Sequence, residues 1–287
     1  MGIIYLMTDY GIQDPYVGIL KSRVGVVNPK ALLVDLSHSL RQYDVSFASW
    51  FLYLSYVSLE SPSFVCAVVD PGVGTERKPI IVRIQKRYFV LPDNGLITLI
   101  YEENKEKSEV FEIEPKKLEK LYKNFLQKKK IQLQYELSTT FHGRDLFAPA
   151  VGFLSYDVKL RKKFTKSCES IYTLKDIIHP IKIDLSQKGN YKGKFVYYDH
   201  FGNLFTNFKI INKKTQNQIQ LKIFEQKKEI MHLENLFSTY GEKEKDSFLF
   251  YVGSFGFLEV AMNQNSAFSK WGNWDQIKNF DLELRVL

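Results

Sequence analysis

The sequence predicts an α/β protein with two domains: an N-terminal domain on a mainly parallel sheet and a smaller C-terminal domain of antiparallel strands. In the first half of the chain, short apolar runs alternate with helix-like stretches, which is typical of βαβ units. From residue 181 onward, apolar and polar residues alternate without evident helices, which is typical of antiparallel strands. At 287 residues, the chain is long enough for two domains.

The elements of the first domain follow one another in a regular order. Strands are expected at residues 3–7, 31–36 and 64–69. Asp14 is expected to be the N-cap and Pro15 the first-turn proline of the helix after the first strand, and Asp44 is expected to cap the helix after the second. Two further β-rich runs lie at 80–84 and 88–91. This alternation of strand and helix predicts parallel pairing of the first three strands.

We expect the first domain to span residues 1–180 and the second to span 181–287. The lysine-rich stretch at about 104–135 is expected to be a basic insertion in the first domain. Within this stretch, apolar residues recur at helical spacing, which leaves the lysines on the opposite face of an amphipathic surface helix. The strands of the second domain are expected at 193–198, 204–210, 219–224, 247–252 and 258–262.

The net charge of +8 does not indicate a nucleic-acid partner, because many of the lysines lie in the predicted surface helix. No nucleic-acid motif and no basic stripe beside an aromatic platform accompanies them. Cys66 and Cys168 lie in unlike surroundings and are expected to be reduced thiols. No signal peptide and no apolar run near the ~20 residues that span a bilayer is visible, so we expect a cytoplasmic protein without a membrane partner.

Five polar clusters join acidic, amide or histidine side chains to glycine turns, where backbone can approach a ligand closely. They are residues 8–11, 70–74, 92–95, 141–145 and 199–203. Asp9, Asp35 and Asp70 lie at or just past the ends of the first three predicted strands. The carboxyl edge of an open α/β sheet is where ligands bind. Each cluster alone is equally consistent with ordinary turn chemistry, so only their combination predicts a site.

A two-metal phosphoesterase is an alternative interpretation of the same acidic and histidine side chains. Its ligands would be Asp9, Asp35, His38, Asp70, His142 and Asp145. The spacing does not favour it, because no H-x-H or H-E-x-x-H pair places two ligands on one face. We therefore predict a site without a metal.

Seven segments spread over nearly the whole chain carry a more specific signal. They are TDYGIQDPYVGILK, VDLSHSLRQYDV, VVDPGVGTERKPI, LPDNGLIT, STTFHGRDLFAPA, YDHFGNLFTN and GSFGFLEVAMNQNSA. Together and in this order they resemble the S-adenosyl-L-methionine (SAM) hydroxide adenosyltransferases, or SAM hydrolases, which are related to the fluorinating and chlorinating SAM enzymes. The resemblance implies a β-barrel-like second domain and a homotrimer. The ligand would lie between the first domain of one subunit and the second domain of a neighbour.

The resemblance also implies roles for side chains of the first domain. Asp70, Arg77 and His142 would position the attacking water or hydroxide. Asp9 would hold the ribose hydroxyls, and Tyr43 would pack against the ligand. The halogenating relatives lack this Asp, Arg and His set, so its presence favours water over halide as the nucleophile.

In the second domain, the resemblance implies contacts to both ends of the substrate. Asp199 would pair with the methionine ammonium, and Ser254 would bind the carboxylate end. Phe201 would stack on adenine, whose edge Asn203 and the backbone near Asn263 would read. The chain departs mildly from the family pattern, with Tyr10, His200 and Phe257 where Phe, Arg and Tyr are usual.

These roles fit the chemistry of SAM. Its sulfonium leaves as a neutral thioether, so the departing group needs no protonation, metal or further cofactor. Holding a water in line behind the ribose 5′ carbon can lower the barrier by about 7–11 kcal/mol. The leading hypothesis is hydrolysis of SAM to adenosine and L-methionine. A SAM-dependent halogenase, a SAM or adenosine sensor without turnover, and a metal-dependent phosphoesterase remain as alternatives.

Overall fold

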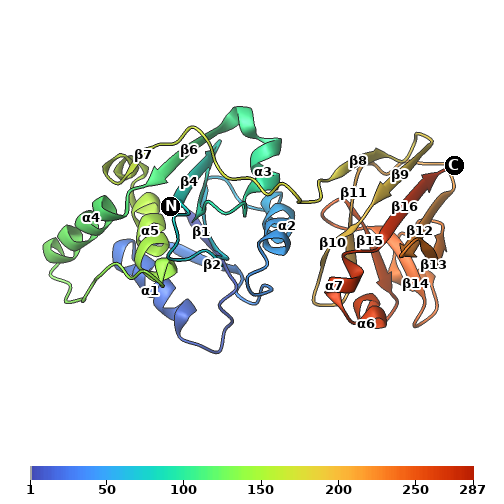
Figure 1. The fold of residues 1–287 in the computed structure, drawn as a ribbon, viewed down its shortest axis with the longest axis horizontal. Coiled ribbons are helices and arrows are strands. Elements are labelled where there is room, and N and C mark those ends of the chain that lie inside the picture. Colours follow the sequence, from blue (N-terminus) through green and yellow to red (C-terminus); the bar gives the residue numbers. More distant parts are fainter. Residues whose placement is uncertain (1) are drawn as a thin grey trace. The chain divides into compact units, whose positions relative to one another are not determined.

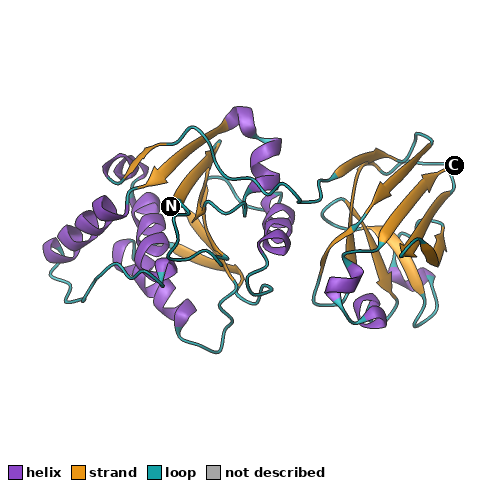
Figure 2. Cartoon of the chain, viewed as in Figure 1, coloured by secondary structure: helices purple, strands orange, loops and turns teal. Residues whose placement is uncertain are grey.

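Two units, each with its own sheets and core, make up the chain in the computed structural model, which describes residues 2–287 (Figure 1). The first unit ends at Lys175, and the second spans Asp176–Leu287. The first combines a sheet with helices, and the second consists mainly of antiparallel strands (Figure 2). The fold class predicted from the sequence is therefore confirmed. Among the helices of residues 2–287, none is both long enough and apolar enough to cross a membrane.

A seven-stranded sheet forms the centre of the first unit, in the order β2-β1-β3-β5-β4-β6-β7. Its strands are β1 (Ile3–Thr8), β2 (Leu32–Ser37), β3 (Ser63–Val68), β4 (Pro79–Ile84), β5 (Arg87–Pro92), β6 (Ser108–Ile113) and β7 (Thr165–Ser167). The first four in spatial order run parallel, and the remaining pairs are antiparallel. The predicted parallel pairing is confirmed where strands alternate with helices, and the antiparallel strands extend the same sheet.

Local sequence chemistry predicted the caps of two helices of the first unit, and one of the two predictions is confirmed. The helices of this unit are α1 (Tyr16–Val27), α2 (Val45–Tyr56), α3 (Thr98–Glu103), α4 (Pro115–Lys128) and α5 (Ala148–Tyr156). Asp44 caps α2 as predicted, because its side chain accepts a 2.9 Å hydrogen bond from the amide of Phe47. The prediction that Asp14 caps α1 is wrong. The N-cap is Pro15, whose backbone is already helical, and Asp14 precedes it, exposed and in the lining of a pocket.

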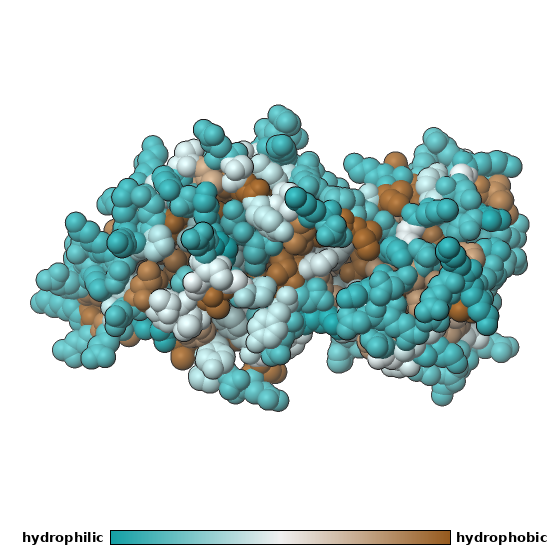
Figure 3. Space-filling model, viewed as in Figure 1, coloured by the Kyte–Doolittle hydropathy of each residue, from teal (hydrophilic) through white to brown (hydrophobic). Residues whose placement is uncertain are grey.

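The lysine-rich stretch contributes a strand and a helix to this unit. β6 pairs with β4 inside the sheet, and α4 buries Leu118, Tyr122 and Leu126 against the core. The lysines of α4 lie on its exposed face, and hydrophilic side chains cover the end of the unit where α4 lies (Figures 1 and 3). The predicted amphipathic surface helix is thus confirmed. A solvated face of this kind accounts for much of the basic charge.

The sheet brings two acidic residues to one edge. β1 and β3 are parallel neighbours, with Thr8 in register with Val68. Asp9 directly follows the end of β1, and Asp70 lies two residues past the end of β3. Both strands are buried along nearly their whole length, which fixes their positions and therefore the starting points of the two loops. The carboxyl edge of the parallel strands is the region from which the site described below is built.

Two sheets form the second unit. One has the order β10-β11-β15-β14 with β8 paired to β11, and the other has the order β13-β12-β16-β9. Their strands are β8 (Ile181–Asp184), β9 (Gly189–Gly193), β10 (Phe195–Tyr198), β11 (Leu204–Asn212), β12 (Ile219–Glu225), β13 (Lys228–Glu234), β14 (Phe248–Val252), β15 (Phe257–Met262) and β16 (Asp281–Val286). Two short helices, α6 (Ala267–Trp271) and α7 (Trp274–Ile277), lie between β15 and β16 in the chain. Every pairing except that of β8 with β11 is antiparallel.

A carboxyl group is buried in the core of the second unit. Glu259 lies on β15 and is only 4% exposed. It accepts a hydrogen bond from the hydroxyl of Tyr251, whose hydroxyl lies 2.6 Å from that of Tyr240. Burial raises the pKa of Glu259 to about 7, and the negative charge of Asp199 adds to this effect, whereas the hydrogen bond from Tyr251 opposes it. Glu259 therefore changes its charge near neutral pH.

Replacing Glu259 with Gln is expected to change how stability depends on pH. Because the folded-state pKa is raised, the folded protein binds this proton more tightly than the unfolded chain does. The stabilisation is fully present below the ordinary pKa of 4.5 and is lost as the pH rises through about 7. Chemical denaturation should therefore show the wild type losing roughly 2–3 kcal/mol relative to Glu259→Gln between about pH 5 and about pH 8. The same pH dependence in both proteins would contradict this prediction.

Candidate active site

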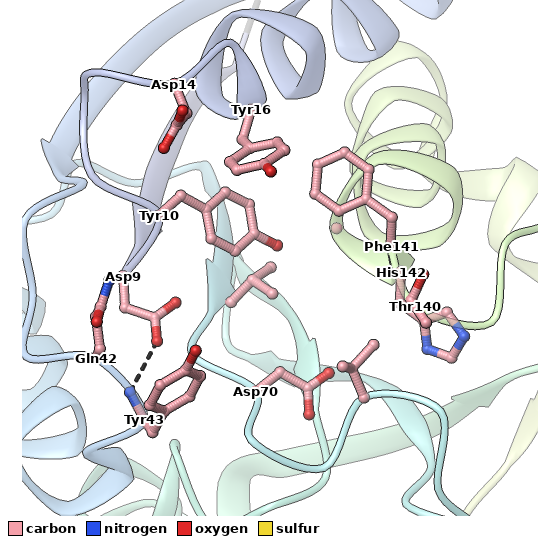
Figure 4. A pocket seen from close by; sticks show the side chains of 13 residues that line it. Asp9, Tyr10, Asp14, Tyr16, Gln42, Tyr43, Asp70, Thr140, Phe141 and His142 are labelled. Atoms are coloured by element: carbon pink, nitrogen blue, oxygen red, sulfur yellow. Dashed lines mark hydrogen bonds between the residues drawn. The ribbon is translucent and has the colours of Figure 1, made fainter.

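A pocket of about 480 Å³ opens at the carboxyl edge of β1 and β3 (Figure 4). It combines three aspartates and a histidine with aromatic side chains and loop backbone. The lining residues are Asp9, Tyr10, Asp14, Tyr16, Gln42, Tyr43, Val68, Asp70, Val73, Thr140, Phe141, His142 and Gly143. Three of the five polar clusters that the sequence singles out therefore meet in one cavity, and a pocket of this size fits a small-molecule ligand.

Asp9 and Tyr43 are held together on one side of the pocket. The backbone amide of Tyr43 donates a 3.0 Å hydrogen bond to Asp9 Oδ2, as the dashed line in Figure 4 marks. Burial raises the pKa of Asp9, and the hydrogen bond from Tyr43 partly offsets the effect. Tyr43 has φ of 64°, a left-handed conformation that bulky residues rarely adopt, and the residue is 70% exposed. The backbone is thus fixed in a costly conformation that leaves an aromatic ring free at the pocket.

Asp70, Arg77 and His142 form one hydrogen-bonded set. Arg77 Nε donates to Asp70 Oδ1 at 3.0 Å, and Arg77 Nη2 donates to Asp70 Oδ2. The same Nη2 lies 2.7 Å from His142 Nδ1. The side chains of Arg77 and Asp70 are 8% and 6% exposed, and the guanidinium packs over the ring of Phe147. Asp70 and His142 line the pocket, whereas Arg77 lies behind them and connects them.

The contact with Arg77 fixes which nitrogen of His142 carries a proton. A guanidinium only donates hydrogen bonds, so Nδ1 of His142 must accept, and the proton of the neutral ring lies on Nε2. Burial lowers the pKa of His142, and the positive charge of Arg77 lowers it further. Near neutral pH the ring is therefore uncharged, and it offers an N–H donor through Nε2. An oxygen that carries negative charge is the partner that this donor stabilises best.

Loop geometry holds these side chains in place. Between Asp70 and Arg77 the chain makes a tight turn in which the hydroxyl of Thr75 donates to the carbonyl of Gly72 at 2.7 Å. Gly74 has φ of 82°, and a Cβ there would lie 2.9 Å from the carbonyl oxygen of Thr139. Glycine at this position thus lets the turn approach the segment that precedes His142. A π-helical turn, Gly143–Phe147, then connects His142 to α5.

Asp35, His38 and Asp145 are not brought into the pocket lining. Asp35 pairs with Lys21 at 2.6 Å and lies 3.1 Å from Nε2 of His38, whose Nδ1 contacts the hydroxyl of Thr8. Asp145 is buried and is held by Arg144. Across residues 2–287, no group of three or more His, Cys, Asp or Glu side chains is arranged to hold a metal ion. The six ligands of the two-metal interpretation therefore do not assemble.

In the second unit, Asp199 and Asn203 close a tight turn. The side chain of Asp199 accepts hydrogen bonds from the Asn203 amide at 2.8 Å and from Asn203 Nδ2 at 2.9 Å. Nδ2 also lies 3.3 Å from the hydroxyl of Tyr240. Because these partners occupy Nδ2, the side-chain oxygen of Asn203 is the atom left to accept from a ligand. An acceptor oxygen of this kind is the partner that the exocyclic amino group of a nucleobase requires, because that group donates hydrogen bonds.

A cavity of about 450 Å³ lies beside this turn, lined by Phe201, Asn203, Tyr240, Met262, Gln264 and Asn265. Phe201 is 76% exposed, which leaves its ring free to stack on a flat ligand. The amide and carbonyl of Asn263 bond to Ser247 and Asp246, so its neighbours Met262 and Gln264, not Asn263 itself, face this cavity. Ser254 is exposed in the turn between β14 and β15. Phe201 and Asn203 thus meet in one cavity, and Ser254 and Asn263 are not part of its lining.

Several pocket residues escaped the sequence analysis. Tyr10, Tyr16 and Phe141 form an aromatic wall, with ring centroids 5.2–6.3 Å apart. Tyr10 and Phe141 lie inside polar clusters that drew attention for other residues. Tyr16 is the first residue of α1, and nothing in its local sequence distinguishes it from an ordinary surface tyrosine. Glu259 does not line this pocket, and the sequence analysis did not identify it either. A carboxylate inside an apolar strand is a sequence signal of a buried charged group.

Comparison with known proteins shows what this architecture is similar to. A crystal structure of an uncharacterized conserved protein from Thermotoga maritima has a TM-score of 0.80, with 28% identity and 99% of both chains covered. A crystal structure of a conserved hypothetical protein from Thermus thermophilus has a TM-score of 0.68, with 26% identity and both chains fully covered. The similarity therefore includes both units of this chain and all or nearly all of each relative.

Curated relatives carry a more specific name. A protein named (R)-S-adenosyl-L-methionine hydrolase from Methanocaldococcus jannaschii is 27% identical, over 98% of this chain and 96% of its own. One of the same name from Thermus thermophilus is 29% identical, over 92% of this chain and 93% of its own. Residues 4–164 match the SAM hydroxide adenosyltransferase N-terminal domain, and residues 193–273 match the C-terminal domain. Both matches contain the side chains described above, and the chain belongs to the SAM hydroxide adenosyltransferase family.

Proposed function

We propose that this protein is an enzyme that hydrolyses SAM to adenosine and L-methionine. Its family and the names of its curated relatives support this reaction. The observation that carries the proposal is the hydrogen-bonded set of Asp70, Arg77 and His142 at the wall of the pocket. This set offers a fixed N–H donor beside carboxylate oxygens, which is what a water needs to be oriented and to gain hydroxide character.

The reaction is a substitution at the ribose 5′ carbon. The oxygen of water or hydroxide forms a bond to C5′, the C5′–S bond breaks, and its electron pair stays on sulfur. The sulfonium thereby becomes the neutral thioether of methionine. When water is the nucleophile, its second proton is lost to solvent, so each turnover releases one proton. Because hydroxide and sulfonium neutralise each other on the way to the transition state, a pocket that excludes water favours the step.

The residues of the first unit have separable roles in this step. His142 donates through Nε2 to the attacking oxygen, and Asp70 offers lone pairs that orient the water protons. Arg77 stays charged and holds both partners, so it acts by positioning them. Asp9, whose side chain lines the pocket beside the Tyr43 amide, binds the ribose hydroxyls, and Tyr43 packs against the ligand.

The second unit supplies recognition of the rest of the substrate. Phe201 stacks on adenine, and Asn203 accepts from its amino group. Asp199 pairs with the methionine ammonium, Ser254 binds the carboxylate end, and backbone near Asn263 contributes to the adenine site. Support for the adenine part comes from the cavity that Phe201 and Asn203 share. SAM and water are the only small molecules required, and no metal or cofactor takes part, because the thioether leaves as a neutral group.

The enzyme is proposed to work as a homotrimer in which each site combines the first unit of one subunit with the second unit of its neighbour. This assembly is suggested by the family resemblance. Cyclic symmetry with a head-to-tail interface would produce three equivalent sites. The cytoplasmic location expected from the sequence stays a prediction.

Incubating the protein with SAM is expected to yield adenosine and methionine in equal amounts, with one proton released per turnover. Liquid chromatography measures the products, and an indicator dye in weak buffer measures the proton. EDTA and added chloride should leave the rate unchanged. Dependence on chloride would indicate the halogenase, loss of activity with EDTA would indicate a metal enzyme, and SAM binding without product would indicate a sensor.

His142→Ala and Asp70→Asn are expected to lower kcat by about a hundredfold or more, because each removes a preorganised contact to the attacking oxygen. Binding of SAM, measured by calorimetry, should change little, since neither side chain is assigned to hold the substrate itself. Thermal unfolding of both variants controls for misfolding, because Asp70 belongs to a buried ion pair. A kcat close to that of the wild type would rule out the water-orienting role.

Mixing two inactive variants tests whether the sites are shared between subunits. Asp70→Asn leaves the second unit intact, and Asp199→Asn leaves the first unit intact. If these variants exchange subunits, random mixing places both intact halves together in about a quarter of the sites of a shared-site trimer. Activity should therefore reappear on mixing, and light scattering should give the mass of a trimer. A mixture that stays inactive despite subunit exchange would place each site within one chain.

A further inference from the structure

Tyr10 lines the pocket next to residues to which the proposed reaction gives roles. It follows Asp9 directly after β1, and its ring packs against Phe141 and Tyr16 at 6.1 and 6.3 Å between centroids. In Figure 4 its hydroxyl points from the Asp9 side of the pocket toward the side on which Phe141 and His142 lie. The aromatic wall thus aims a polar atom, the Tyr10 hydroxyl, into the cavity.

Within residues 2–287, no side chain or carbonyl forms a hydrogen bond with the Tyr10 hydroxyl. The contacts of this residue include the hydrogen bond of its backbone amide to Thr8 and the packing of its ring on Tyr16 and Phe141. Burial raises the pKa of Tyr10 well above its usual value of 10, and the charges of Asp9 and Asp70 add to this effect. The phenol therefore stays protonated and remains a donor over the whole physiological range. A donor that lines the pocket and has no protein acceptor is available to whatever occupies the pocket.

Gly143 explains why the hydroxyl can lie where it does. A Cβ at position 143 would overlap the Tyr10 hydroxyl oxygen and would lie 3.1 Å from Cζ and 3.3 Å from Cε2. The hydroxyl therefore occupies the space that a side chain at position 143 would fill. His142 precedes this glycine, so the hydroxyl lies beside the histidine backbone. Tyr10 and Gly143 fit together as a pair, and neither can be enlarged without moving the hydroxyl.

We propose that Tyr10 is a further catalytic residue, whose hydroxyl donates a hydrogen bond to the oxygen of the attacking water or hydroxide, together with Nε2 of His142. This role rests on the proposed hydrolysis of SAM. Tyr10 transfers no proton in the step: its O–H bond stays intact while the water oxygen bonds to C5′ and the C5′–S electron pair moves to sulfur. Two donors that converge on one oxygen favour its hydroxide form and direct its remaining lone pair toward carbon.

Tyr10→Phe tests the role, because it removes one oxygen atom and keeps the ring that packs against Tyr16 and Phe141. The expected result is a fall in kcat of about tenfold, the size that one lost hydrogen bond to a charged oxygen gives, with KM for SAM changed less than about twofold. The rise of kcat with pH should also shift to higher pH, since hydroxide loses one of its donors. A purely structural role would not move this profile.

Gly143→Ala provides a second, independent way to displace the hydroxyl. Alone, it should lower kcat to a similar degree as Tyr10→Phe, because the new methyl group takes the space of the hydroxyl oxygen. In the Tyr10→Phe background it should cost much less, so the two losses should not add. Fully additive losses would mean that Gly143→Ala acts through His142 alone, and would overturn the coupling between the two residues.

Controls separate this inference from the proposed function. Tyr156→Phe, at the exposed end of α5, makes the same chemical change away from the pocket and should leave kcat and its pH profile unchanged. Wild-type protein that forms no adenosine would refute the proposed function itself. Wild-type turnover with a Tyr10→Phe kcat within twofold and an unshifted pH profile would refute only the role of Tyr10.

Discussion

The guanidinium of Arg77 is the group on which the rest of the candidate site depends. It bonds to both oxygens of Asp70 and also contacts Nδ1 of His142, so one cation joins two loops that are far apart in the chain. Each of these loops has an additional constraint. Gly74 allows the first to approach Thr139, and the π-helical turn after His142 attaches the second to the buried helix α5. The ion pair is buried, and such a pair is stable only when its hydrogen bonds are well made.

This arrangement determines what kind of chemistry the pocket can perform. The charge of Asp70 is compensated by Arg77, and His142 is kept neutral with its proton on Nε2. The pocket therefore presents donors to an oxygen nucleophile and keeps Asp9 as a separate acceptor for hydroxyl groups. A site that relied on His142 as a general base would need a free ring nitrogen as acceptor, and the contact with Arg77 takes that nitrogen. Stabilising hydroxide is thus the chemistry to which this geometry is suited.

Sequence patterns predicted the parts of this structure that depend on local rules. Asp9 and Asp70 were predicted to face one edge because both follow parallel strands, and Asp44 was predicted to cap its helix. The cap at Asp14 was wrong, since the backbone of Pro15 is already helical and takes the N-cap position. Asp35 satisfied the same edge rule as Asp9, yet Lys21 and His38 hold it outside the pocket. The position of a residue after a parallel strand therefore predicts that it lies at the carboxyl edge of the sheet. Whether its side chain turns toward the pocket depends on the contacts around it.

Other features depend on distances that no local pattern contains. The proton position of His142 follows from a contact with a residue 65 positions away. Glu259 lies in a strand that is buried on both faces, so the alternation of apolar and polar residues could not reveal which side chains are enclosed.

The left-handed backbone of Tyr43 lowers the stability of the folded protein. A left-handed tyrosine costs about 1–2 kcal/mol, and a glycine at this position would recover the part of that cost that exceeds its own entropic penalty. The aromatic ring of Tyr43 is thus presented at the pocket at the expense of thermal stability, and a protein with glycine in its place would melt at a slightly higher temperature but would lack the ring.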